Sequence, residues 1–155
     1  MKLLKYFPSL FFLLFLDQLT KFLVEHSALH TQELKLTPFL SLLYAQNTGV
    51  AFSLFAQWSS VFLSITTAVI LIIVLVFFLN AHNNPAKNLA CLFILAGAMG
   101  NFFDRLRLGY VIDFIYFHIE PFFHFAVFNL ADCFITAGAF LFILGELMTK
   151  QPEKH

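Results

Sequence analysis

The stretch from Ser60 to Leu79 contains no charged side chain. A membrane-spanning helix needs about 20 consecutive, mostly apolar residues, and this stretch supplies them without interruption. The whole chain has 155 residues, of which 60% are hydrophobic and only 12% are charged. A soluble domain has about 45–50% apolar and about 25% charged residues. The apolar excess is more than one protein core requires, so the sequence predicts an integral membrane protein.

Three further segments have the length and composition of membrane spans: residues 7–24, 88–103 and 128–147. We therefore expect a single membrane domain over residues 1–155. Its predicted fold class is an all-α integral membrane protein with four transmembrane helices and a small extracytoplasmic β-containing segment. The apolar stretch Tyr110–Phe125 contains both acidic residues and a proline. We interpret it as an interfacial, aromatic-rich loop rather than a fifth span.

The first predicted span has the position of a cleaved signal peptide, because Lys2 and Lys5 precede its apolar residues. No convincing cleavage site with small residues follows it, however. Asp17 and Lys21 also interrupt the apolar run, which is unusual for a segment that is removed. We therefore expect this span to remain as a membrane anchor.

The distribution of Lys and Arg outside the spans predicts the orientation in the membrane. Five of these residues lie on one side and three on the other: Lys2, Lys5, Lys87, Lys150 and Lys154 against Lys35, Arg105 and Arg107. This bias places both termini and residues 80–87 in the cytoplasm. Residues 25–59 and 104–127 then lie outside. The alternating pattern around Lys35 and the apolar run Phe39–Tyr44 predict short strands on the outer membrane surface.

Ionisable side chains inside a membrane cost roughly 2.5–3.5 kcal/mol each, yet this chain has several. Asp17 and Lys21 are four residues apart on one helix, so we expect them to form a structural pair. Other polar residues fall near the outer ends of the spans: Asn101, Asp104 and Arg105 on the third, Asn129 and Asp132 on the fourth, with Asp113 between them. Their convergence predicts one polar site that faces the outer surface.

Simpler roles exist for some of these residues. Asp132 lies in the first turn of a helix, where the helix dipole favours a carboxylate, so it is a candidate capping residue. Asp113 by itself has the appearance of a surface loop residue. His118, Glu120 and His124 are candidate metal ligands, but no His-Glu-x-x-His motif accompanies them, and we predict no metal site.

Five short motifs occur in order along the chain: Asp17–Lys21 (DQLTK), Asn47–Phe52 (NTGVAF), Gly97–Arg105 (GAMGNFFDR), Val111–Phe114 (VIDF) and Phe128–Asp132 (FNLAD). Each motif is weak alone, but five in this order on the appropriate segments are specific. Together with four spans and this length, they make the chain resemble the bacterial lipoprotein signal peptidases (signal peptidase II). The resemblance covers about residues 10–145.

The resemblance implies an aspartic endopeptidase of the bacterial inner membrane. Such an enzyme removes the signal peptide from prolipoproteins by cleaving before a diacylglyceryl-modified cysteine. The resemblance implies these roles: Asp113 and Asp132 are the catalytic pair, Asn129 orients them, and Asn47, Asn101 and Arg105 bind substrate or support the site. It implies no metal or organic cofactor. The expected partners are the lipidated substrate and membrane lipid, nucleic acid is not expected because the net charge is zero, and we expect a monomer.

The chemistry of two neighbouring carboxylates agrees with this assignment. In a poorly solvated site both cannot easily ionise, so one retains a proton. The ionised carboxylate takes a proton from water, the water attacks the scissile carbonyl, and the protonated carboxyl acts as the acid. The two groups titrate as a coupled pair, and the sequence leaves open which one is the base.

Two non-enzymatic kinds of membrane protein, a transporter and a structural subunit, are also compatible with this composition. In a small ion-coupled transporter the buried polar residues would form a proton relay, but we find no internal repeat, and the polar groups lie away from the bilayer midplane. In a structural membrane subunit, Ala96 and Gly100 would pack against a helix of another protein. The same spacing also packs helices within one chain. Substitution of Asp113 or Asp132 with an assay of prolipopeptide cleavage separates the three hypotheses.

Overall fold

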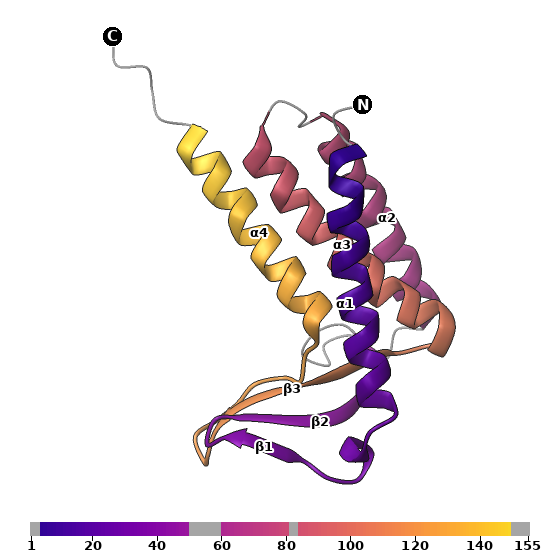
Figure 1. Ribbon diagram of the computed structural model, residues 1–155, viewed down its shortest axis with the longest axis vertical. Helices are drawn as coiled ribbons and strands as arrows, with labels where there is room; N and C mark the ends of the chain where they lie inside the picture. The colour runs from indigo at the N-terminus through magenta and orange to yellow at the C-terminus, as the bar shows by residue number, and fades with distance from the viewer. Residues whose placement is uncertain (1–3, 50–59, 81–83, 150–155) are drawn as a thin grey trace.

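A computed structural model describes residues 4–49, 60–80 and 84–149. In these residues, long helices stand beside one another and a small sheet lies across one end of them (Figure 1). The helices are α1 (Phe7–Glu25), α2 (Ser60–Asn80), α3 (Pro85–Leu108) and α4 (Leu130–Thr149). All four are long and apolar enough to cross a membrane, which confirms the predicted number of spans.

Helix α3 is the central helix of the bundle, because it packs against each of the other three. Two of its glycines allow close approach. A β-carbon at Gly97 would meet the carbonyl oxygen of Ala131 on α4, and one at Gly100 would meet the carboxylate of Asp17 on α1. Ala96 is also fully buried. The small residues of α3 therefore pack against helices of the same chain.

The predicted boundaries of the third helix, 88 and 103, are too short at both ends. Asn84 caps the helix, because its side-chain oxygen accepts a hydrogen bond from the backbone N–H of Lys87 at 3.1 Å. At the other end the helix continues to Leu108 and stops at Gly109, which has a φ of 82°. Few residues other than glycine adopt this left-handed conformation. Asp104 therefore lies within the helix rather than in the segment that follows.

Within the described residues, the sheet has four antiparallel strands in the order β1-β2-β3-β4. They are β1 (Leu34–Thr37), β2 (Leu40–Asn47), β3 (Val111–Ile119) and β4 (Phe123–His124). The first two confirm the strands predicted in this part of the chain. The loop predicted over residues 110–125 is wrong, because β3 and β4 lie there. The chain thus combines membrane-type helices with a small sheet, and the description all-α does not fit it.

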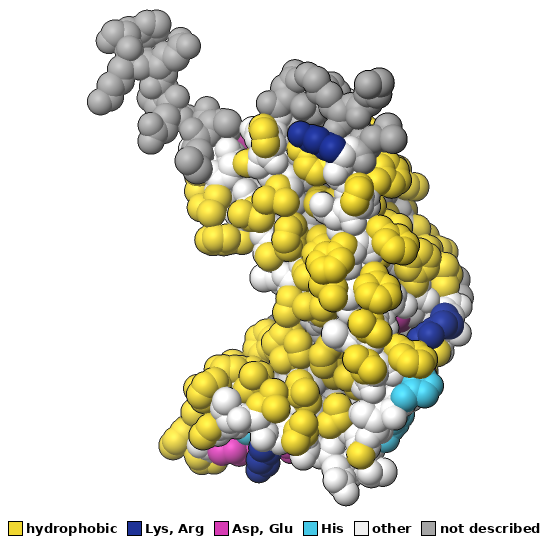
Figure 2. Space-filling view, viewed as in Figure 1, with side chains coloured by type: hydrophobic (Ala, Val, Ile, Leu, Met, Phe, Trp, Pro, Cys, Tyr) yellow, Lys and Arg dark blue, Asp and Glu magenta, His cyan; other side chains and the backbone are white. Residues whose placement is uncertain are grey.

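The pairing of β2 with β3 positions the polar residues at one end of the sheet. Ala45 pairs with Asp113, and Asn47 pairs with Val111. Ile112 and Phe114 are buried, and they pack with Val24 of α1. This contact fixes β3 against the end of the helix bundle. Figure 2 shows apolar side chains over the helices and continuing onto the sheet, with a hollow between α4 and the sheet.

Candidate active site

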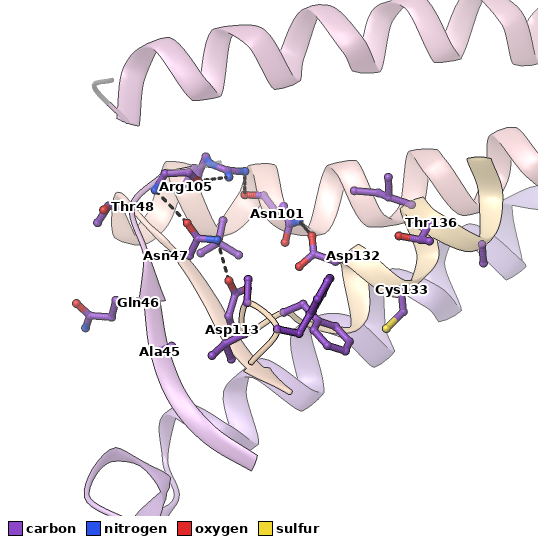
Figure 3. Close-up of a pocket in the computed structure, with 18 of the residues that line it drawn as sticks. Ala45, Gln46, Asn47, Thr48, Asn101, Arg105, Asp113, Asp132, Cys133 and Thr136 are labelled. Atoms are coloured by element: carbon purple, nitrogen blue, oxygen red, sulfur yellow. Dashed lines mark hydrogen bonds between the residues drawn. The ribbon is translucent and has the colours of Figure 1, made fainter. Parts of the chain in front are cut away.

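A cavity of about 1170 Å³ lies where the end of α3, the start of α4 and strands β2 and β3 meet. Its lining includes five of the predicted site residues: Asn47, Asn101, Arg105, Asp113 and Asp132. Figure 3 shows these side chains around one space. They come from β2, α3, β3 and α4. The remaining wall is largely apolar and includes Phe125, Ile135 and Phe140.

Asp113 is a buried residue of β3, with only 2% of its surface exposed. Its two carboxylate oxygens accept hydrogen bonds from two amide side chains. Asn47 Nδ2 donates at 2.8 Å and Asn129 Nδ2 donates at 2.6 Å. Burial, followed by the nearby charge of Asp132, raises the pKa of Asp113 to about 7, although both amides oppose the shift. Asp113 is therefore able to hold a proton near neutral pH.

Asp132 lies in the first turn of α4, and both of its carboxylate oxygens also accept hydrogen bonds. Asn101 Nδ2 donates to Oδ1 at 2.8 Å, and the backbone N–H of Asn129 donates to Oδ2 at 3.1 Å. The backbone N–H of Asp132 in turn donates to Asn129 Oδ1 at 3.0 Å. This reciprocal arrangement is a capping box. Asp132 therefore caps α4, as the simpler hypothesis predicts, and also lines the cavity.

Two amide side chains connect the two carboxylates. Asn129 Nδ2 donates both to Asp113 and, at 3.1 Å, to Asn101 Oδ1. Asn101 then donates to Asp132. Asn129 is fully buried and Asn101 is 7% exposed. Because amide groups have a fixed planar geometry, this bridge holds the two carboxylates in a defined relation on one side of the cavity.

Arg105 lies at the edge of the same cavity and connects α3 to the segment after β2. Its guanidinium donates to the backbone carbonyls of Asn101, at 3.4 Å, and Gly49, at 3.3 Å. Asn47 Oδ1 accepts a hydrogen bond from the backbone N–H of Gly49 at 3.0 Å. The rest of the NTGVAF motif, residues 50–52, lies outside the described residues.

The predicted pair Asp17–Lys21 is present, and it has a third member. Lys21 Nζ lies 3.0 Å from Asp17 Oδ2 and 2.9 Å from Asp104 Oδ2. These three side chains are at most 1% exposed. Lys21 also donates to Asn101 Oδ1 at 3.0 Å. Asp104 belongs to the polar site predicted from the sequence, but the sequence did not assign it an individual role. Its spacing of three residues from Asn101 was the available signal.

The candidate metal ligands lie in β3 (His118), in β4 (His124) and in the turn between them (Glu120), and they are not part of the cavity lining. His118 is buried, and its Nε2 lies 3.0 Å from Ser41 Oγ. Its Nδ1 lies 3.5 Å from a carboxylate oxygen of Glu120. In the part of the chain that the structure describes, no group of three His, Cys, Asp or Glu side chains is arranged to hold a metal ion.

Comparisons with known proteins identify the family to which the chain belongs. The family model described as signal peptidase (SPase) II matches residues 9–148. A lipoprotein signal peptidase of Bartonella quintana is 42% identical over 141 residues, which are 90% of this chain and 84% of that protein. One of Brucella ovis is 40% identical and covers 90% of this chain and 87% of its own length.

Solved structures show the same fold. A structure described as a bacterial membrane enzyme superposes with a TM-score of 0.86 at 31% identity, covering 97% of this chain and 93% of the other. A second structure described in the same words gives a TM-score of 0.81 at 30% identity, with coverages of 95% and 94%. Because the family model spans nearly all of the chain, including every residue of the polar cavity named above, the chain belongs to the signal peptidase II family.

Proposed function

We propose that this chain is an aspartic endopeptidase that removes the signal peptide from prolipoproteins, with Asp113 and Asp132 as its catalytic pair. The observation that carries this proposal is the bridge of Asn129 and Asn101, which joins the two carboxylates beside one cavity. Its relatives are named lipoprotein signal peptidases, which favours this reading over a transporter or a structural subunit.

In the proposed mechanism, one proton is shared between the two carboxylates. Asp113 carries it near neutral pH, because burial raises its pKa to about 7. Asp132 accepts two N–H hydrogen bonds at a helix N-terminus, an arrangement that suits an ionised carboxylate. Asp132 takes a proton from a water molecule, whose oxygen attacks the scissile carbonyl carbon. Asp113 gives its proton to the carbonyl oxygen, which would otherwise become an oxyanion.

Breakdown of the tetrahedral intermediate restores the pair. The C–N bond breaks as the proton on Asp132 passes to the leaving nitrogen. The hydroxyl that Asp113 protonated returns its proton as the new carboxyl group forms. Each carboxylate therefore ends in its initial state, and the reaction consumes one water. Asn129 and Asn101 donate hydrogen bonds to the pair, so they keep both carboxylates oriented toward the cavity.

The substrate class follows from the walls of the cavity. Polar residues line one side, and apolar residues such as Ile135 and Phe140 line the other. We propose that cleavage occurs before a diacylglyceryl-modified cysteine, with the peptide bond on the polar side and the acyl chains in lipid. The polar peptide group then lies among polar residues, and the apolar acyl chains remain in an apolar environment.

We further propose a single-domain monomer in the bacterial inner membrane, with both termini in the cytoplasm. The excess of lysine near the termini and in residues 80–87 supports this orientation. The sheet and the cavity then lie at the extracytoplasmic end of the bundle. Prolipoproteins present their cleavage site at this side after export of the chain that follows it.

Replacement of either carboxylate tests the proposal. Asp113→Asn and Asp132→Asn should each abolish cleavage of a diacylglyceryl prolipopeptide, because an amide can neither accept nor donate the required proton. Glu120→Gln is a matched control, since Glu120 is an exposed carboxylate outside the cavity lining. It should cleave at the wild-type rate. Near-normal turnover by either aspartate variant would remove that residue from the mechanism.

A further inference from the structure

Two buried carboxylates outside the catalytic pair hold the backbone next to it. Asp104 Oδ2 accepts a hydrogen bond from the N–H of Ile112 at 3.3 Å, and Asp17 Oδ1 accepts one from the N–H of Ala131 at 3.0 Å. Ile112 directly precedes Asp113 in the chain, and Ala131 directly precedes Asp132. Each of the two carboxylates therefore holds the backbone N–H of the residue directly before one member of the pair.

These two carboxylates are themselves joined. Lys21 Nζ lies within 3.0 Å of both, as described above. Gln18 Nε2 forms a second bridge, with hydrogen bonds of 3.1 Å to Asp17 Oδ2 and to Asp104 Oδ1. The absence of a side chain at Gly100 gives Asp17 its space between α1 and α3. The distance between the backbone at Ile112 and the backbone at Ala131 is thus set by contacts among the buried side chains described here.

Charge balance alone does not explain this group. One aspartate is enough to neutralise Lys21, so the charge of Lys21 alone does not require a second buried carboxylate. Burial of a carboxyl group away from water is unfavourable unless its oxygens have partners. The backbone contacts give each carboxylate a role. Asp104 binds the residue before Asp113, and Asp17 binds the residue before Asp132.

We infer that Asp104 and Asp17 are positioning residues for the catalytic pair, with Asp104 fixing the peptide before Asp113, Asp17 fixing the peptide before Asp132, and Lys21 setting the distance between them. This inference rests on the proposed function. Displacement of a catalytic group by about 1 Å can cost about 10²-fold in rate. The contribution of these residues should therefore appear in kcat, although none of them lines the cavity.

Two variants of Asp104 separate positioning from charge. Asp104→Ala removes the acceptor for Ile112 N–H but leaves Lys21 paired with Asp17, so no isolated cation is created. Asp104→Asn removes the same charge but keeps one carbonyl oxygen that can accept from Ile112. We expect kcat to fall about 10²-fold in the alanine variant with KM nearly unchanged. The asparagine variant should stay within about threefold of the wild type.

The pH dependence of kcat supplies a readout that a loss of stability would not move. Asn47 and Asn129 donate to Asp113, and the charges of Asp132, Lys21 and Arg105 act on it. When β3 is released in Asp104→Ala, Asp113 loses part of its contact with the two amides, and its pKa rises further. The decline in kcat at alkaline pH should therefore move to higher pH.

A control variant accounts for stability. Leu92→Ala removes a buried side chain of the same helix, about 18 Å along the axis from Asp104. Only variants that are isolated as folded, monodisperse protein are compared. Leu92→Ala should lose about as much thermal stability as Asp104→Ala but keep the wild-type kcat and pH profile. If Asp104→Ala does not fold, Asp104→Leu replaces it, because leucine fills the same space and also lacks the acceptor.

The outcomes distinguish the two proposals. Wild-type kcat and pH profile in folded Asp104→Ala or Asp104→Leu would overturn the positioning role, as would equal losses in the asparagine and alanine variants. If Asp113→Asn still cleaves the lipopeptide, the proposed function fails instead. If Asp113→Asn is inactive and Asp104→Ala is fully active, only the positioning inference fails.

Discussion

Asn129 and Asp132 cap the first turn of α4 for each other, because the backbone N–H of each residue donates to the side chain of the other. The same two side chains belong to the amide bridge beside the cavity. The hydrogen bonds that cap the start of α4 therefore also hold Asp132, one member of the proposed catalytic pair. A change at either residue acts on both the fold and the chemistry.

This dual role predicts different results for two substitutions of Asp132. Asp132→Asn keeps a side-chain oxygen for the N–H of Asn129 but loses the acceptor for Asn101, so it should lose activity with a small loss of thermal stability. Asp132→Ala also loses the cap and should be less stable by about 1 kcal/mol. Thermal unfolding in detergent measures the difference. Equal stability of the two variants would show that the capping bond contributes little.

The raised pKa of Asp113 predicts a change in how stability depends on pH. Its pKa is 3.8 in an unfolded chain and about 7 in the folded protein, so folding binds a proton between these values. Stability must then fall as the pH rises from about 4 to above 7, by up to about 4 kcal/mol.

Asp113→Asn removes this penalty and should therefore be more stable than the wild type at pH 8. We expect a gain of about 1–3 kcal/mol, because the amide also loses one acceptor oxygen that a neighbouring side chain uses. At pH 4 the ionisation penalty is nearly absent, so the lost acceptor should leave the variant less stable than the wild type by about 1–2 kcal/mol. Denaturation of both proteins across this range is the measurement, and a constant difference at all pH values would contradict the assignment.

The lipid on the substrate should dominate recognition near the cleavage point. Burial of acyl chains is worth about 0.8 kcal/mol per methylene, and it holds the peptide in the plane of the site. We expect an otherwise identical peptide without the diacylglyceryl group to be cleaved more slowly by orders of magnitude. Both peptides are compared in the same detergent. Equal rates would leave a general membrane aspartic protease instead of the proposed lipoprotein-specific enzyme.

The proposed orientation predicts which residues are accessible from each side of the membrane. In a protein whose own cysteines, Cys91 and Cys133, are replaced, Glu33→Cys should react with an impermeant maleimide in intact spheroplasts. Lys5→Cys should react only after permeabilisation. Both positions are solvent-exposed in the structure, so accessibility within the protein does not limit the reaction. The reverse pattern would invert the topology.

The sequence predicted the elements with strong patterns and missed those in which polar and apolar signals conflict. The apolar run after Ser60 identified α2 directly. For α3, the predicted boundary at residue 103 followed the end of the apolar run, whereas the helix ends at Leu108 and is capped by Gly109, a stop signal that was present in the sequence.

Strand β3 was missed for a related reason. Its residues are mostly β-branched or aromatic, which favours a strand, but the nearby Glu120 and Pro121 suggested a loop. The pairing with β2 involves residues far apart in the sequence, and local patterns do not report it. The contacts of Asp104 with Lys21 and Ile112 are hidden for the same reason, since they require the packing of α1, α3 and β3.

The spacing of Asp17 and Lys21 has a consequence for the order in which the chain enters the membrane. Because the two are four residues apart on α1, they can neutralise each other before any other helix is present. The first helix can thus insert during synthesis without exposing an isolated charge to lipid. Asp104 lies near the end of α3 and is synthesised later, when Lys21 is already present on the first helix to pair with it. We therefore expect the pair on the first helix to form before the rest of the site is assembled around it.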